Sequence, residues 1–239
     1  MVVQVEICTP SRASALAAKQ GGAQRIELCR DLACGGLTPS DEDIEYCTRT
    51  LGLRTHVLVR PRAGNFYYNS DEVAEIMATI ERCRRLGAAA VVVGFLDYDG
   101  RIDKVLTRRA VQAAEGMEVT FHRAFDEARQ DPEEALLAIV EAGCSRLLTS
   151  GQQPTAPEGA EVIRRLVEAA SRLTTAKHRF KVLAGSGITA TNARRLVELT
   201  GVDEVHGSCK SVLPDGTIET DANQVAQLIR ALGKNQHIR

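Results

Sequence analysis

The sequence predicts a single-domain (β/α)8 TIM barrel, and three observations lead to this fold class. First, eight short runs of β-branched, aliphatic or aromatic residues recur along the 239 residues, each followed by Gly, Pro, Ser, Thr or Asp. Second, amphipathic segments with apolar residues at helical spacing separate these runs. Third, eight units give about 30 residues per unit, which agrees with a barrel of about 250 residues. No linker or low-complexity stretch interrupts the chain, so we predict one domain over residues 1–239.

The eight runs define the expected strands in chain order. They span residues 3–8, 24–29, 54–60, 89–94, 118–123, 145–150, 180–185 and 204–208. Four glycines come just after predicted helices, where a left-handed residue commonly ends a helix: Gly21, Gly87, Gly143 and Gly201. An open doubly wound sheet is the alternative fold, but residues 8–11 lack the Gly-rich turn that usually follows its first strand.

Composition and charge exclude several classes of protein. The formal net charge is −1, from 30 Lys and Arg against 31 Asp and Glu, so the basic excess of a polyanion binder is missing. Aromatic residues make up 4% and Trp is absent, which argues against a base-stacking platform for nucleic acid. No apolar run approaches about 18 residues, so we predict no membrane-spanning segment.

The seven cysteines contain no CxxC pair, and the N-terminus resembles a strand rather than an export signal. We therefore expect reduced thiols and a cytoplasmic protein. Barrels of this size often self-associate, so a homo-oligomer is a further expectation.

Alternation along the strands directs polar side chains toward the barrel axis. Alternate residues of a barrel strand point outward to the helices and inward to the axis, and the apolar set should face the helices. The inward set then contains Glu6, Glu27, Arg60, His122 and His206. Charges of this kind are costly to bury unless they are paired. They predict a site in the barrel mouth, where the carboxyl ends of the strands meet; the alternative is a structural network of salt bridges.

The tripeptide Glu-x-Cys occurs on both of the first two expected strands, as Glu6-x-Cys8 and Glu27-x-Cys29. Neighbouring strands lie about 4.8 Å apart, so each like pair should share one face. Paired carboxylates can split their pKa values and act as acid and base, unless a nearby arginine neutralises them. Two facing thiolates suit Cu(I), although spacing alone favours two small buried residues.

Three loops after strands carry further candidates. Arg60 and Arg62, in a loop with three aromatic residues, could cover an anionic ligand or pack on the rim. His122, followed by Arg123 and by Asp126, could be a base with its orienting partner or a core histidine. Loops after strands seven and eight commonly bind phosphate in this fold, which makes Gly187 and Ser208 candidates; a tight turn is the alternative.

Together these motifs resemble the CutC family, which is named for copper homeostasis. The matching stretches are EIC (residues 6–8), GGAQRIELC (21–29), GGLTPS (35–40), RPRxGNF (60–66), VTFHRAFD (119–126), LLTSG (147–151) and HGS (206–208). The resemblance implies a TIM barrel, a cytoplasmic location and a role in copper homeostasis. It also implies that Cys8 and Cys29 match the two positions proposed as Cu(I) ligands, whereas Cys34 and Cys209 lie outside the usual pattern.

Two functional hypotheses follow. The first is a cytosolic copper-homeostasis protein that binds Cu(I) through Cys8 and Cys29 at the barrel mouth. The alternative is a TIM-barrel enzyme acting on a small anionic or phosphorylated metabolite by acid–base chemistry. Its acid–base candidates are Glu6, Glu27, His122, Asp126 and His206. Its substrate-binding candidates are Arg60, Arg62, Arg123, Gly187 and Ser208.

Overall fold

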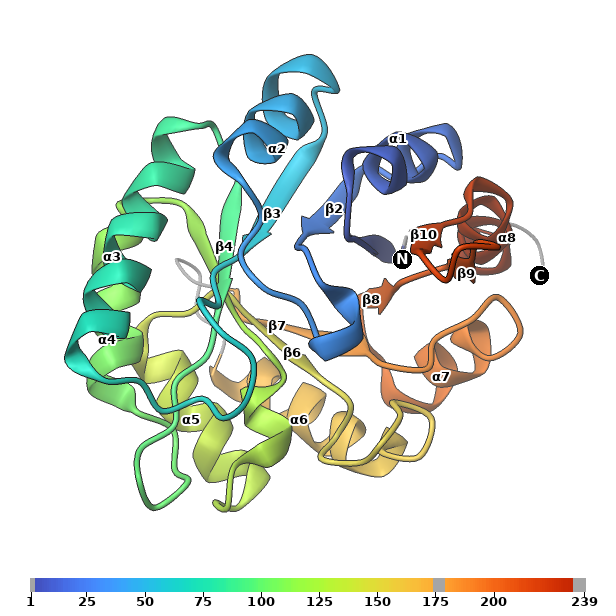
Figure 1. The fold of residues 1–239 in the computed structure, drawn as a ribbon. Coiled ribbons are helices and arrows are strands. Elements are labelled where there is room, and N and C mark those ends of the chain that lie inside the picture. Colours follow the sequence, from blue (N-terminus) through green and yellow to red (C-terminus); the bar gives the residue numbers. More distant parts are fainter. Residues whose placement is uncertain (1–2, 174–178, 234–239) are drawn as a thin grey trace.

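Eight parallel strands close into a barrel in the computed structural model, which describes residues 3–173 and 179–233 (Figure 1). The strands are β1 (Gln4–Thr9), β2 (Arg25–Leu28), β3 (Arg54–Leu58), β4 (Ala90–Val93), β5 (Glu118–Phe121), β6 (Arg146–Thr149), β7 (Lys181–Gly185) and β8 (Glu204–Gly207). Because β1 pairs with β8 as well as with β2, the sheet has no edge. The predicted TIM barrel is therefore confirmed and the open sheet is excluded.

A ring of helices surrounds the strands (Figure 1). The helices are α1 (Arg12–Gln20), α2 (Asp41–Glu45), α3 (Ser70–Arg85), α4 (Lys104–Ala114), α5 (Pro132–Ala142), α6 (Ala160–Leu173), α7 (Ala193–Thr200) and α8 (Ala222–Gly233). A π-helical turn, Tyr46–Thr50, extends α2, and an antiparallel hairpin of β9 (Lys210–Val212) and β10 (Ile218–Thr220) precedes α8. Sequence reasoning missed this hairpin.

The ends of the helices follow local chemistry. The Asn69 side chain accepts hydrogen bonds from backbone N–H groups in the first turn of α3, and the Glu72 carboxylate accepts one from the Asn69 N–H, which forms a capping box. At the C-terminal end of α5, Gly143 adopts a left-handed φ of 99°, as predicted. Gly21 differs, because it is right-handed with a φ of −73°. A Cβ there would lie 2.6 Å from Ala222 O, so this glycine permits close approach of α8.

The two faces of each strand pack in different layers. Outward residues such as Ile7, Ile26 and Val57 are fully buried in the large apolar layer between strands and helices. Inside the barrel, Cys8, Cys29, Leu58 and Val92 form a separate small apolar cluster. This arrangement follows the predicted alternation, so the inward polar residues lie within the barrel.

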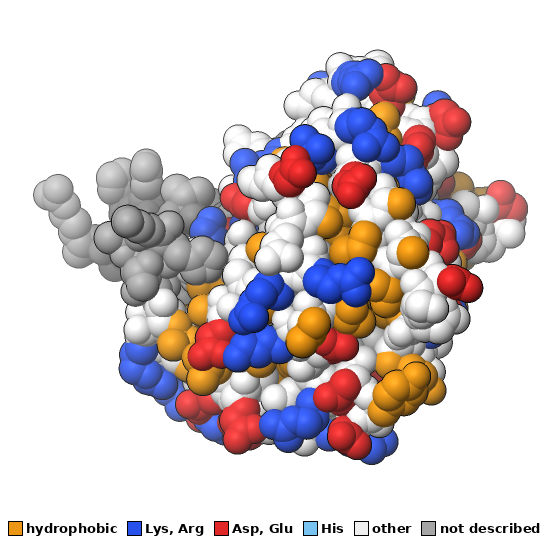
Figure 2. All heavy atoms as spheres, turned by 90° about the vertical axis from the view of Figure 1, so that its left-hand side faces the viewer, with side chains coloured by type: hydrophobic (Ala, Val, Ile, Leu, Met, Phe, Trp, Pro, Cys, Tyr) orange, Lys and Arg blue, Asp and Glu red, His pale blue; other side chains and the backbone are white. Residues whose placement is uncertain are grey.

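The outer face formed by α3 and α4 has mixed charge, with basic and acidic side chains lying close together (Figure 2). Pairs such as Arg84–Glu115 and Lys104–Glu141 join neighbouring elements there. Among the helices of the described ranges, none is long and apolar enough to cross a membrane.

Candidate functional site

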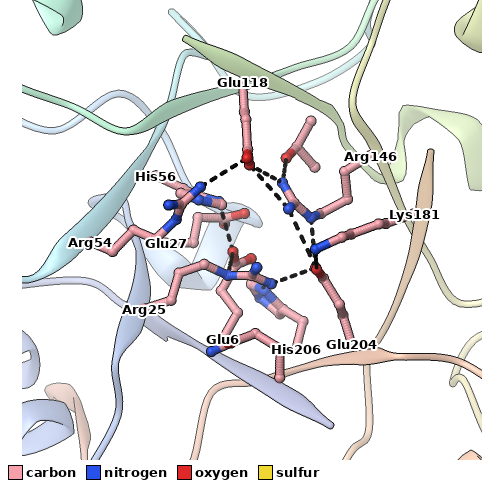
Figure 3. Close-up of polar contacts among 12 residues, drawn as sticks. Glu6, Arg25, Glu27, Arg54, His56, Glu118, Arg146, Lys181, Glu204 and His206 are labelled. Carbon is pink, nitrogen blue, oxygen red and sulfur yellow. Dashed lines mark hydrogen bonds and ion pairs between the residues drawn. The ribbon is translucent and has the colours of Figure 1, made fainter. Parts of the chain in front are cut away.

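A network of buried ion pairs lies inside the barrel, toward the amino-terminal ends of the strands (Figure 3). Arg25 joins the carboxylates of Glu6 and Glu204, with its Nε and Nη2 each 2.7 Å from an Oε2 atom. Arg146 Nε lies 2.6 Å from the same Glu204 oxygen. His56 Nδ1 lies 2.8 Å from Glu6 Oε2. All five side chains are almost fully buried, so the structural salt-bridge interpretation applies to this part of the barrel.

The network reaches solvent at the amino-terminal end of the strands. Arg146 also contacts Glu118 at 3.1 Å, and Lys181 Nζ lies 2.8 Å from Glu204 Oε1. Burial alone would raise the pKa of Glu204, but hydrogen bonds and charge from Arg25 and Arg146 lower it below its ordinary value. Burial likewise opposes ionisation of Glu6, whereas His56 and Arg25 hold the pKa of Glu6 well below its usual range. Both carboxylates are therefore ionised at neutral pH.

A cavity of about 830 Å³ opens above this network, at the carboxyl ends of the strands. Nine of the predicted site residues line it: Cys8, Glu27, Arg60, His122, Arg123, Asp126, Gly187, His206 and Ser208. Glu6, Cys29 and Arg62 do not line it, although Glu6 and Cys29 contact residues that do. The barrel mouth thus brings together most of the side chains that strand alternation placed there.

One wall of the cavity carries Glu27, His206 and Cys8, whose ligand atoms lie within 4.8 Å of one another. His206 Nδ1 lies 3.0 Å from Glu6 Oε1, so the buried network holds this imidazole in place. Burial opposes charge on His206, but Glu27, Cys8 and Glu6 outweigh it and raise the pKa of His206 well above its ordinary value. Burial also raises the pKa of Glu27 to about 7.

Glu27 differs from Glu6 and Glu204 because it forms no direct ion pair with the residues that the structure describes, although a ring nitrogen of His206 lies within 4.8 Å of its carboxylate. Its Oε2 atom is buried and has no hydrogen-bond partner in the part of the chain that the structure describes. Figure 3 shows Glu27 next to the network but outside its dashed contacts. An unsatisfied buried carboxylate oxygen costs about 1–3 kcal/mol, so it needs an explanation such as a ligand.

The two thiols of the repeated Glu-x-Cys motif face each other. Cys8 Sγ and Cys29 Sγ are 3.8 Å apart in the small apolar cluster, and of the two residues Cys8 lines the cavity. The contact with Cys29, together with burial, raises the pKa of Cys8 well above its ordinary value. Cys34 and Cys209 also line the cavity, whereas Cys83 is buried on α3.

A further part of the cavity lining carries hydrogen-bond donors that pack against the ring of Phe66. The guanidinium carbon of Arg60 and the ring centroid of His122 each lie 4.9 Å from the Phe66 centroid. Arg60 donates through Nη1 and Nη2 to the carbonyls of Cys34, Gly36 and Gly64. Its Nε has no partner within the described ranges.

His122 is a neutral donor. Its Nδ1 accepts a hydrogen bond from the Ala124 N–H at 3.1 Å, so the proton of the neutral ring is on Nε2. Burial, with help from the charge of Arg60, lowers the pKa of His122 to about 3. Nε2 has no partner among the residues described. Gly94 makes room for the ring, since a Cβ at that position would overlap it.

Two predicted roles differ from the structure. Asp126 does not orient His122; its carboxylate accepts hydrogen bonds from the Ser150 and Gln152 N–H groups and from Arg123 Nε. It therefore fixes the loop after β6. The reason is that residues Arg123–Glu127 turn in a 3₁₀ helix, which directs this side chain to the next strand end.

Arg62 does not cover the cavity. Its Nε contacts Glu72 Oε1 at 2.5 Å, and its Nη atoms donate to the Asn65 and Tyr67 carbonyls. The side chain binds the start of α3, so this part of the loop packs on the rim, which was the alternative interpretation.

The loops after β7 and β8 form the remaining rim. Residues 186–191 and 207–210 line the cavity, and Gly187 has a φ of 70°. The backbone N–H groups of Gly187, Ile188 and Ser208 donate no hydrogen bond within the described ranges. Free N–H groups at this position of the fold commonly bind anions.

Comparisons with known proteins agree with the resemblance found in the sequence. The sequence model of the CutC family matches residues 3–211. The CutC proteins of Histophilus somni and Chromobacterium violaceum are 42% and 44% identical to this chain over 209 and 207 residues, covering 87% and 86% of this chain and 83% and 81% of theirs.

Solved structures give the same relationship. The CutC protein of Streptococcus agalactiae, to which copper homeostasis has been provisionally assigned, is 31% identical with a TM-score of 0.78, covering 86% of this chain and 98% of that one. Thiamine phosphate pyrophosphorylase of Pyrococcus furiosus has a TM-score of 0.62 at 18% identity, covers 97% of this chain and 96% of its own, and shares the fold alone.

Proposed function

Because the chain belongs to the CutC family, we propose that it binds Cu(I) through Cys8 and Cys29 and serves copper homeostasis in the cytoplasm. The observation that carries this proposal is the 3.8 Å separation of the two Sγ atoms, of which that of Cys8 belongs to a residue lining the cavity. Soft thiolates select Cu(I) over harder cations, and both sulfurs are near enough to contact one ion.

The surroundings of the thiols fit a monovalent cation. Glu27 and His206 lie beside Cys8 and offer further ligand atoms. An ion beside Cys8 would also lie next to the carboxylate of Glu27, whose Oε2 atom has no hydrogen-bond partner within the described ranges. Because Cys8 is held protonated, binding has to release a proton, and the apparent affinity should rise with pH.

Copper titration tests the thiols directly. Under anaerobic, reducing conditions and in competition with a chromophoric Cu(I) chelator, the wild type is expected to bind about one ion per chain. Cys8→Ser and Cys29→Ser are each expected to weaken binding by more than the roughly 10–100-fold that loss of an outer-shell partner costs. The double variant should not bind.

The matched control is Cys83→Ala, which removes a buried thiol of α3 and should leave the stoichiometry unchanged. Copper bound equally well by the double variant, or no copper bound by the wild type, would refute the proposal.

The cavity favours a second candidate function, an enzyme that acts on a small anionic or phosphorylated metabolite. A volume of about 830 Å³ is far larger than one ion needs and lies in the range of small-molecule sites. Hydrogen-bond donors and the carboxylate of Glu27 line the same space, as they do in binding sites with a defined substrate orientation.

Inorganic phosphate is the probe for this candidate. Titration into ¹⁵N-labelled protein is expected to shift the amide signals of Gly187, Ile188 and Ser208. Arg123→Gln should weaken binding several-fold because it removes a charged donor of the cavity wall. Arg62→Gln is the control, since the structure places that arginine on Glu72, and it should bind as the wild type does. The candidate fails if phosphate shifts no signal of the cavity.

A further inference from the structure

We infer that the cavity performs proton transfer at a carbon next to a carbonyl group, with Glu27 as the base and with His122 and Arg60 binding the carbonyl oxygen. The substrate class is a small 2-oxo acid, or a phosphorylated ketone or aldehyde. This inference rests on the second candidate function and uses neither thiol of the copper proposal.

Two donors without partners in the described ranges lie beside the same aromatic ring. Arg60 and His122 approach the same Phe66 ring at 4.9 Å, so their N–H groups are held in one region of the wall. Both side chains are only 6% exposed, and both keep a nitrogen without a partner among the described residues, Nε of Arg60 and Nε2 of His122. Two preorganised donors in a water-poor site are the arrangement that stabilises a developing oxyanion.

His122 is suited to donate a hydrogen bond rather than a proton. The Ala124 N–H occupies Nδ1, which fixes the proton on Nε2 and leaves the ring without charge. The positive charge of Arg60 on the same aromatic ring opposes a second cation. A neutral imidazole can therefore polarise a carbonyl through repeated turnovers, a pattern known from other enolising barrels.

Glu27 is the group that can accept the proton. It is 5% exposed, lines the cavity, and has a free Oε2 atom within the described ranges. The other buried carboxylates of the barrel, Glu6 and Glu204, are each bound to Arg25 and do not line the cavity. Glu27 lies on β2 and the donors follow β3 and β5, and all three residues line the same cavity.

The anionic group of the substrate would bind at a part of the cavity separate from Glu27, Arg60 and His122. The unbonded N–H groups of Gly187, Ile188 and Ser208, with the side chain of Arg123, lie on the same cavity. Either a carboxylate or a phosphate accepts hydrogen bonds from such groups. The anion would orient the carbonyl toward Arg60 and His122.

The step balances without any co-reactant. Glu27 takes the proton from the carbon; the C–H electron pair forms a carbon–carbon double bond, and the carbonyl π pair moves to the oxygen. The oxyanion accepts hydrogen bonds from Nε2 of His122 and Nε of Arg60. Return of the proton from Glu27 to carbon regenerates the carboxylate, and nothing is oxidised or reduced.

Deuterium incorporation in D₂O tests the step, with pyruvate and 2-oxobutyrate as carboxylate probes and dihydroxyacetone phosphate as the phosphate probe. The wild type is expected to accelerate loss of the α-proton NMR signal of one probe by about 100-fold or more over protein-free buffer. Glu27→Gln should lose this acceleration. His122→Phe should remove most of the acceleration, whereas His122→Gln, which keeps an N–H donor, should recover part of it.

Glu75→Gln, on the exposed face of α3, is the control and should exchange at the wild-type rate. A second measurement needs no substrate: ¹⁵N NMR of His122 should show protonation on Nε2 and none on Nδ1, with the Nε2 signal shifted by the active probe. Exchange equal in Glu27→Gln and wild type, or an Nδ1-protonated ring, overturns the inference. Probe binding without exchange overturns it while the anion-binding candidate stands, and no binding of probes or phosphate overturns both.

Discussion

Replacing Arg146 with methionine is expected to lower the free energy of unfolding by about 3–5 kcal/mol. Arg146 is 1% exposed and contacts Glu204, Glu118 and Thr120. Its removal leaves carboxylates in the barrel interior with less compensating charge, and the cost of an uncompensated buried charge exceeds the contribution of the lost packing.

Urea unfolding of both proteins at pH 7 measures this effect. Arg164→Met is the matched control, because Arg164 forms ion pairs with Glu161 and Glu168 on the solvent face of α6, and it should unfold at the wild-type midpoint. A second variant, Arg146→Met with Glu204→Leu, should recover part of the loss because it also removes the buried carboxylate that Arg146 compensated, while Arg25 keeps its contact with Glu6. Equal stability of Arg146→Met and wild type would show that the network does not stabilise the fold.

Acid is expected to weaken the fold through His122 between pH 6.5 and about 3. The unfolded chain binds a proton on this ring at its ordinary pKa of 6.5, whereas the folded chain holds its pKa near 3. The unfolded state therefore binds more protons in this window, so stability falls as pH falls, by roughly 4–5 kcal/mol over the whole range.

Comparison of wild type with His122→Gln isolates that contribution. Glu6 and Glu204, whose pKa values are lowered, also lose stabilisation as pH falls below about 4.5, but they do so in both proteins. Between pH 7 and pH 4 the variant should lose about 3 kcal/mol less than the wild type. Parallel losses in the two proteins would mean that His122 is not held neutral in the folded state.

Strand periodicity was sufficient to predict the barrel and the convergence of polar side chains in its mouth. A period of two places Glu27 and His206 inward whatever the helices do, and strand ends of one sense meet at one rim. Strand periodicity could not predict which inward residues form the buried ion-pair network and which line the cavity. Glu6 and Glu27 look equivalent in sequence, yet Arg25 pairs with Glu6 and not with Glu27.

The remaining differences have local causes that spacing does not encode. Arg62 binds the first turn of α3, because a guanidinium pairs with the nearest accessible carboxylate. Arg146 was not among the predicted inward residues, because the residues that follow it in the same strand, Leu147 and Leu148, are apolar. The hairpin of β9 and β10 had a usable signal, since Pro214, Asp215 and Gly216 form a typical turn sequence.

That hairpin ties the two ends of the described chain together. Glu219 Oε2 accepts a hydrogen bond from Ser11 Oγ at 2.6 Å, and the Thr220 N–H donates to Ser14 Oγ at 2.7 Å, across more than 200 residues. β1 likewise takes β8 as its second neighbour. During synthesis on the ribosome, β1 therefore keeps one edge unpaired until β8 has emerged. Until then, this unpaired edge of the nascent chain is accessible to chaperones and to mispairing with other strands.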